Sequence, residues 1–127
     1  MNKQETIINF HHENTEWINK LNFYKDEIII FNNRLSEVAS KNNSKDVLSE
    51  IEKFQNQFII QNNTIDQIKH IINLDEDKIK KELNLHSGAI DIKKVESHPG
   101  ERDLVDTFEK NFNLLRADFN KFIGKWM

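Results

Sequence analysis

The sequence of 127 residues predicts an all-α protein, an antiparallel bundle of three long amphipathic helices in one domain that spans residues 1–127. Apolar residues recur at alternating spacings of three and four along three long segments, as they do on one face of a helix. Glycine occurs only three times and proline once, whereas 31% of the residues are charged. This composition is typical of long helices.

The first helix is predicted from about residue 5 to residue 41. Its apolar stripe comprises Ile7, Phe10, Trp17, Leu21, Tyr24, Ile28, Phe31, Leu35 and Val38, and Asn14 fills the one gap. The polar run Lys41–Ser44 then predicts a turn in which Asn43 or Ser44 caps the next helix. So short a connection predicts a tight antiparallel hairpin.

The second helix carries the same pattern, first clearly and then less cleanly, through Ile51, Phe54, Phe58, Gln61, Ile65, Ile68, Ile72, Asp75, Ile79 and Leu83. Asn73 followed by Glu76 resembles a capping box. The sequence therefore leaves two possibilities open, one continuous helix or a break near residues 73–75 that would give a bundle of four helices. The hairpin register also places Tyr24 opposite Gln61, and we expect a hydrogen bond between these two side chains.

Residues 86–101 contain two of the three glycines and the only proline, which predicts a long irregular connection. The third helix is predicted from about residue 102 to residue 125. Its stripe comprises Val105, Phe108, Phe112, Leu115, Phe119, Phe122 and Trp126. Eight of the nine phenylalanines lie on the three stripes and only Phe23 does not, which predicts a shared core rich in aromatic rings.

Several classes of function are disfavoured by composition. The chain has no cysteine, which excludes disulfides and thiolate chemistry. Its 18 basic residues are interspersed among 21 acidic ones, so we expect no nucleic-acid partner. The longest apolar run is Ile28–Phe31, so we expect neither a signal peptide nor a membrane span, and a cytoplasmic location. Phosphate-binding loops and hydrolase motifs are also missing, which favours a protein that is not an enzyme.

One group of side chains predicts a metal site, and it comprises His11, His12, Glu16 and His70. His12 and Glu16 are four residues apart, as are Asp66 and His70, so each pair shares one helical face. Imidazole and carboxylate together bind transition metals, although the apolar stripes turn most of these residues outward. We therefore favour the interpretation that they are surface residues, and the metal site is the alternative. Glu82 with His86, and Glu96 with His98, are interpreted as solvated pairs. No cofactor is favoured, and a transition metal is the one that these residue types allow.

The first two helices carry more apolar residues than their stripes need. The surplus residues are Ile18, Ile29, Ile30, Ile59 and Ile60. Apolar surface of this kind predicts association, with a second copy of the chain or with another helical protein. Association is therefore the leading function. A metal-binding or small redox bundle is the first alternative, and a carrier of an apolar small molecule between the helices is the second.

Three runs of sequence resemble a family of small, uncharacterised bacterial all-helical proteins. They are residues 17–28 (WINKLNFYKDEI), residues 54–59 (FQNQFI) and the ending at residues 119–127 (FNKFIGKWM). The resemblance spans most of the chain. It implies the helical fold and attaches no activity, ligand or catalytic residue.

Overall fold

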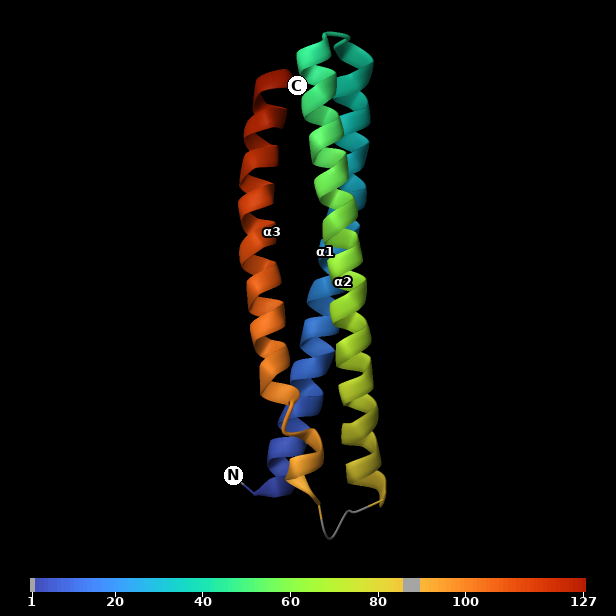
Figure 1. Ribbon diagram of the computed structural model, residues 1–127, viewed down its shortest axis with the longest axis vertical. Helices are drawn as coiled ribbons and strands as arrows, with labels where there is room; N and C mark the ends of the chain where they lie inside the picture. The colour runs from blue at the N-terminus through green and yellow to red at the C-terminus, as the bar shows by residue number, and fades with distance from the viewer. Residues whose placement is uncertain (1, 86–89) are drawn as a thin grey trace.

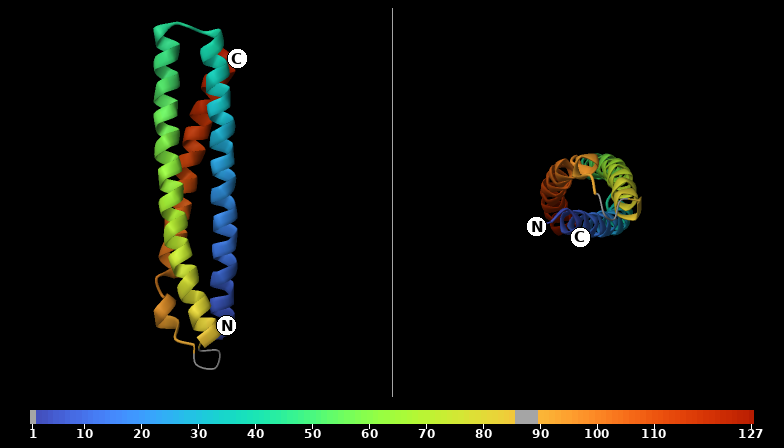
Figure 2. Two further views of the ribbon diagram at one scale, coloured as in Figure 1. Left: turned by 90° about the vertical axis from the view of Figure 1, so that its right-hand side faces the viewer. Right: turned by 90° about the horizontal axis from the view of Figure 1, so that it is seen from below.

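The computed structural model describes residues 2–85 and 90–127, and it confirms the antiparallel bundle of three long helices (Figure 1). Helix α1 spans Lys3–Lys41, α2 spans Lys45–Leu85 and α3 spans His98–Trp126. A short 3-10 turn, η1 (Ile92–Val95), precedes α3. Helices α1 and α2 form a hairpin, and α3 runs parallel to α1. The carboxyl terminus therefore lies near the α1–α2 turn, whereas η1 lies near the amino terminus (Figure 2).

Side chains cap the helices where the sequence predicts a turn. Ser44 Oγ accepts a hydrogen bond from the Val47 backbone nitrogen at 3.3 Å, as expected for the residue that caps α2. At the end of α1, Asn42 Nδ2 donates to the Val38 carbonyl at 3.0 Å. Asn2 caps the start of α1 and accepts from the Glu5 backbone nitrogen at 2.8 Å. These contacts satisfy backbone groups that a helix end leaves without partners.

Helix α2 continues through residues 73–76 without interruption, so the alternative with four helices is wrong. Glu76, which would close the capping box, has another partner in the bundle, as does the neighbouring Asp75. Asp75 accepts a hydrogen bond from Asn14, and Glu76 pairs with His11. Because these carboxylates bind side chains of α1, the local capping signal does not end the helix.

The connection at residues 86–101 is only partly irregular, and residues 86–89 lie outside the described residues. Helix α3 begins at His98, four residues before the predicted start. Pro99 lies in its first turn, where the missing backbone N–H costs nothing. The segment before α3 packs on the bundle through a small apolar cluster that comprises Ile7, Ile79, Ile90 and Val95.

The three apolar stripes meet in the main core, as predicted. Seven of the eight stripe phenylalanines are buried there or at its edges, and the eighth, Phe10, packs at the η1 end. Phe23, the one that lies off the stripes, is 60% exposed. The predicted hydrogen bond between Tyr24 and Gln61 is wrong. The Tyr24 hydroxyl instead donates to Glu109 of α3 at 3.1 Å, because its ring packs between α1 and α3 against Phe108 and Phe112.

A ladder of three ion pairs joins α1 to α3. Its rungs are Glu13–Arg102, Lys20–Glu109 and Glu27–Arg116. Successive rungs are one heptad apart on both helices, and the charges alternate in sign along each helix. A slip of α3 by one heptad would place Glu13 beside Glu109 and Lys20 beside Arg116. The ladder therefore favours one register of α3 over its nearest alternatives.

None of the helices in the described ranges has a stretch with the length and apolar character that spanning a bilayer requires.

Candidate functional site: a buried polar cluster around His98

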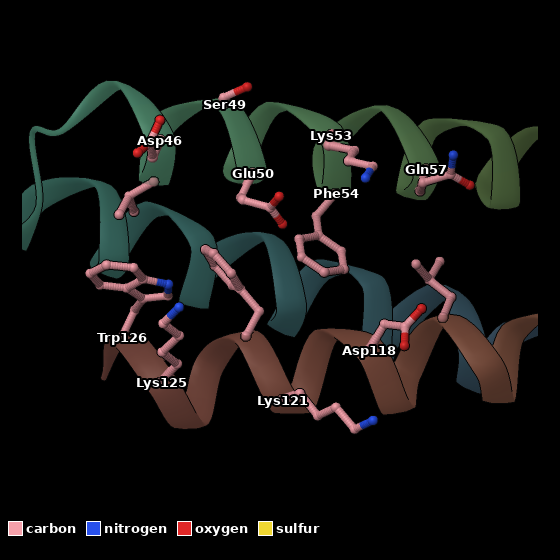
Figure 3. A pocket seen from close by; sticks show the side chains of 13 residues that line it. Asp46, Ser49, Glu50, Lys53, Phe54, Gln57, Asp118, Lys121, Lys125 and Trp126 are labelled. Carbon is pink, nitrogen blue, oxygen red and sulfur yellow. The ribbon is translucent and has the colours of Figure 1, made fainter.

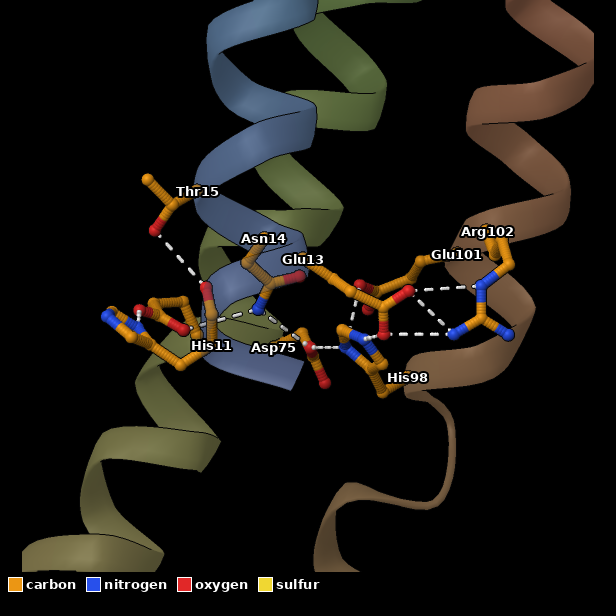
Figure 4. A network of polar contacts seen from close by, with 9 residues as sticks. His11, Glu13, Asn14, Thr15, Asp75, His98, Glu101 and Arg102 are labelled. Carbon is orange, nitrogen blue, oxygen red and sulfur yellow. Dashed lines mark hydrogen bonds and ion pairs between the residues drawn. The ribbon is translucent and has the colours of Figure 1, made fainter. Parts of the chain in front are cut away.

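His98 is the first residue of α3, and its side chain is fully buried. One ring nitrogen, Nδ1, lies 2.7 Å from Asp75 Oδ2 of α2, and the other, Nε2, lies 3.1 Å from Glu13 Oε1 of α1. Because both nitrogens face carboxylates, both act as donors and the ring is an imidazolium. Burial acts to lower the pKa of His98, but the hydrogen bonds to Asp75 and Glu13 outweigh it and raise the pKa above its ordinary value. His98 thus links all three helices (Figure 4).

Two aromatic rings of α1 stack on this imidazole. The Phe10 centroid lies 4.0 Å from the His98 centroid and the Trp17 centroid lies 5.0 Å from it, with interplanar angles of 19° and 22°. Aromatic faces attract a cation, and attract it more strongly where water is excluded. The two rings therefore stabilise the charged imidazole and close the cluster on the α1 side.

Asp75 and Glu101 form the acidic part of the cluster, and both side chains are at least nine-tenths buried. Burial acts to raise the pKa of Asp75, but hydrogen bonds from His98 and Asn14 hold the pKa below its ordinary value. Glu101 behaves in the opposite way. Burial and the negative charge of Asp75 raise the pKa of Glu101 to about 8. At neutral pH the pair therefore holds one negative charge and one proton.

Glu13 connects the cluster to the surface of the bundle. Its carboxylate accepts hydrogen bonds from Arg102 Nη2 at 2.7 and 2.9 Å and from Arg102 Nε at 3.1 Å. Burial acts to raise the pKa of Glu13, but the hydrogen bonds from Arg102 and His98 outweigh it and lower the pKa. A second arm leads away from Asn14, whose Nδ2 donates to Asp75 Oδ2 at 3.1 Å and to Glu76 Oε1 at 3.2 Å.

Three buried oxygens of the cluster have no hydrogen-bond partner within the described part of the chain. They are Asn14 Oδ1, Asp75 Oδ1 and Glu101 Oε2. A buried acceptor without a partner is costly, and such groups in native proteins often mark a bound ion or water. Asp75, His98 and Glu101 each offer one ligand atom, and these three atoms lie within 4.8 Å of one another.

The distances within this trio suit a transition-metal ion. Ligand atoms about 2.1 Å from a tetrahedral Zn²⁺ lie roughly 3.4 Å from one another. His98 Nδ1 lies 2.7 Å from Asp75 Oδ2 and 3.8 Å from Glu101 Oε2, one distance on each side of that value. The two distances that involve His98 therefore bracket the ligand spacing of a tetrahedral site.

The residues predicted as metal ligands do not form this site. His11 pairs with Glu76 at the edge of the cluster, whereas His12, Glu16 and His70 are exposed. Within residues 2–85 and 90–127, the one convergent trio of metal-ligating side chains is Asp75, His98 and Glu101. The i, i+4 spacing correctly pairs residues on one helix, but it does not tell whether the shared face points toward a neighbouring helix.

The interpretation of Glu96 and His98 as a solvated pair is wrong for His98. It followed from starting the third helix at residue 102, which left His98 in a loop. The stripe of α3 continues backward from Val105 to Glu101 and His98 at spacings of four and three, and this signal was present in the sequence. Glu82 is buried as well and accepts from the Asp91 backbone nitrogen at 2.9 Å, whereas its expected partner His86 lies outside the described residues.

Four of the five predicted interface isoleucines are exposed. The exposed fractions of Ile29, Ile30, Ile59 and Ile60 lie between 51% and 60%. Ile18 is the exception, because its side chain is partly buried against the main core. Ile18 lies beside the apolar stripe of α1, on the side that packs against α2.

A cavity of about 920 Å³ opens between α2 and α3 at the end of the bundle opposite His98 (Figure 3). Charged residues of both signs line it, among them Glu50, Lys53, Asp118 and Lys125. Ser49 and Lys121 point away from the space between the helices. Among the described residues, the charged side chains of this cavity form no convergent group of metal ligands, so the cluster around His98 is the stronger candidate site.

Fold and site together define a class, a three-helix antiparallel bundle with a buried cluster of carboxylates and imidazole at one end. No family model, curated protein or solved structure matches the chain. The resemblance to bacterial helical proteins stays an expectation, and function is argued from the site alone.

Proposed function

We propose that this protein binds a divalent first-row transition-metal ion through Asp75, His98 and Glu101. The observation that carries the proposal is the convergence of three buried ligand atoms, accompanied by two buried carboxylate oxygens, Asp75 Oδ1 and Glu101 Oε2, without a hydrogen-bond partner among the described residues. Imidazole nitrogen and carboxylate oxygen together suit Zn²⁺, Fe²⁺, Co²⁺ or Mn²⁺.

The charges of the cluster also support a cation. Glu13, Asp75 and Glu101 supply three carboxyl groups, and among the described residues Arg102 is the one permanently charged cation hydrogen-bonded to them. When no ion is bound, protons on His98 and Glu101 neutralise the remaining negative charge of the cluster. Metal binding releases protons from its ligands, so a divalent ion would replace these two protons at little electrostatic cost.

The variant Glu101→Gln tests the assignment, because a neutral amide resembles the protonated carboxyl of the metal-free protein but cannot supply a charged ligand. We expect wild-type protein, stripped with a chelator, to bind one equivalent of Zn²⁺ or Co²⁺ in isothermal titration calorimetry. Glu101→Gln should keep the far-UV circular dichroism spectrum and lose roughly tenfold or more in affinity.

The exposed histidines supply matched controls for this experiment. His12→Ala and His70→Ala remove imidazoles that the sequence favoured as ligands but that lie on the surface, so both variants should bind the ion as the wild type does. Absence of saturable binding by the wild type would leave the cluster as a purely structural network. Loss of metal binding in His12→Ala would instead assign the metal site to the exposed residues around His12.

Association with a second copy is a second candidate function, favoured by the exposed isoleucines. The pairs Lys25–Asp66 and His11–Glu76 set the register of the hairpin, and in this register Ile29 lies at the height of Ile59. Ile29 and Ile59 therefore form a small apolar patch across two antiparallel helices, whereas Ile60 lines a pocket between α2 and α3. A patch of this symmetry can pair with itself across a two-fold axis.

Light scattering coupled to size exclusion tests the association. We expect a dimer in the micromolar range that becomes monomeric in Ile29→Lys/Ile30→Lys without loss of helicity. Leu114→Lys is the matched control, because Leu114 is also exposed but lies on α3. A wild-type monomer at high micromolar concentration would rule out this second function and leave the metal proposal untouched.

A further inference from the structure

A small pocket lies beside the metal-ligating trio, between α2 and α3. Its volume is about 270 Å³. Asp75 and Glu101 line it, and its other main lining residues are Ile71, Leu74, Lys78 and Leu104. Two of the three proposed ligands therefore reach both the buried cluster and the pocket. An ion held by Asp75 and Glu101 would border this space.

The remaining sides of the trio are covered by protein. Phe10 and Trp17 stack on the His98 ring from α1. Glu13, bound to Arg102, covers the Nε2 side of the same ring. The pocket is thus the side from which an external molecule can reach the ion. Three protein ligands leave a four-coordinate metal with one position for such a molecule.

We propose that this pocket takes a small anionic ligand, a short-chain carboxylate that coordinates the bound ion through its oxygen. The proposal rests on the metal site proposed above. Lys78 adds a positive charge to the pocket lining, and Ile71, Leu74 and Leu104 offer apolar contact for a short alkyl chain. At roughly 30 Å³ for each water molecule, the volume corresponds to about nine waters, which suits a ligand of a few carbon atoms.

Gly100 gives a direct way to fill the pocket. It lies in the first turn of α3, lines the pocket, and an added Cβ would meet no atom within 4 Å. Its backbone φ is not positive, so a larger side chain causes no backbone strain. Gly100→Leu therefore occupies the pocket while Asp75, His98 and Glu101 stay in place. Gly124 provides the control, because it lies in the same helix and an added Cβ there also meets nothing within 4 Å.

Cobalt(II) supplies the spectroscopic probe, since its visible absorption responds to a change of ligand. Chelator-stripped protein is loaded with Co²⁺ and titrated separately with azide, acetate and butyrate. We expect saturable spectral shifts in the wild type and in Gly124→Leu, with butyrate binding more tightly than acetate. Gly100→Leu should bind Co²⁺ with unchanged stoichiometry but lose about tenfold or more in anion affinity. Lys78→Met should weaken anion binding, while Co²⁺ should still bind with unchanged stoichiometry because Asp75, His98 and Glu101 are all present.

The outcomes separate the two proposals. If the wild type binds no Co²⁺, the metal site itself fails, and this inference fails with it. If Co²⁺ binds but its spectrum does not respond to any of the anions, the metal site stands and the anion pocket is overturned. An unchanged anion affinity in Gly100→Leu also overturns it. If Gly100→Leu also loses Co²⁺ binding, the Lys78→Met variant tests the anion pocket instead. An unchanged anion affinity in Lys78→Met would then overturn the proposal of an anion pocket.

Discussion

The imidazole of His98 is a positive charge placed where the bundle has no contact with water. Its two carboxylate partners and its two stacked rings come from α1 and α2, so the charge is stabilised by groups distant in sequence. Burying an ion pair costs desolvation energy that good geometry only partly offsets. A cluster of this kind is therefore a weak source of stability, which is in keeping with a role in binding.

The protonation of the cluster predicts how stability depends on pH in the metal-free protein. The pKa of Glu101 is about 8 in the folded chain and near 4.5 when unfolded, so the folded state binds more protons between these values. Its contribution to the free energy of unfolding therefore falls as pH rises through this window. The raised pKa of His98 acts in the same direction, because its contribution is complete below 6.5 and is lost as pH rises through the folded value.

Asp75 and Glu13 set the acid limit, because their pKa values are lowered in the folded protein and their contributions disappear as pH falls through those values. We expect stability to decline from about pH 5 to about pH 8 in urea denaturation with a chelator present. Glu101→Gln should flatten this decline. Stability that rises over the same window in the wild type would contradict the assignment of the proton to Glu101.

Some polar residues of this cluster are recognisable in the sequence as interruptions of apolar stripes. The sequence does not show, however, that they contact one another. Asn14 and Asp75 occupy stripe positions on two helices, which places them inward. The single-helix pattern does not give the axial alignment of α3, and that alignment brings His98 and Glu101 to the same height. The site could be predicted only as inward polar positions, not as one cluster.

The ladder between α1 and α3 makes the alignment of these helices testable. Glu27 and Arg116 form its best-buried rung, in which Arg116 Nε donates to Glu27 Oε2 at 3.0 Å. Glu27→Lys places two cations together and should lower the free energy of unfolding by about 1 kcal/mol or more. The double variant Glu27→Lys/Arg116→Glu should recover part of this loss.

The recovery is incomplete because the Arg116 guanidinium also lies over the rings of Tyr24 and Phe112. Urea denaturation of the four proteins of this double-mutant cycle measures the coupling, and the coupling should shrink in high salt. A coupling energy near zero at low salt would show that the ladder does not select the register of α3.

Helix boundaries followed the sequence closely where local chemistry decides them. The turn at residues 42–44 and the cap at Ser44 are both set by residues within one turn of the boundary. The start of α3 at His98 is different, because the side chains of His98 and Glu101 are held by α1 and α2. A boundary fixed by contacts between helices is not readable from the segment alone.

The aromatic core dominates the stability of the bundle as a whole. Phe112 is fully buried, and its ring lies near those of Tyr24, Phe31 and Phe108. Phe112→Ala should lower the free energy of unfolding by about 3–5 kcal/mol, through lost transfer energy and the cavity left behind. Phe23→Ala, which truncates the exposed phenylalanine, should change it by less than about 0.5 kcal/mol.

Thermal or urea denaturation followed by circular dichroism compares these two variants directly. Similar losses for Phe112→Ala and Phe23→Ala would mean that the core is not where the stripes place it. The architecture itself was accessible from sequence, because periodicity over about 40 residues leaves little doubt about which face of a helix is buried.

The distribution of the metal-ligating trio has a consequence for how the chain assembles. Asp75 belongs to α2, His98 and Glu101 belong to α3, and the rings and carboxylate that orient His98 belong to α1. A chain that has formed only the α1–α2 hairpin therefore holds one of the three proposed ligands, Asp75, and lacks the other two. Any affinity for a cation arises only when the last helix docks, so free ion in solution would favour the completed bundle over the open hairpin by mass action.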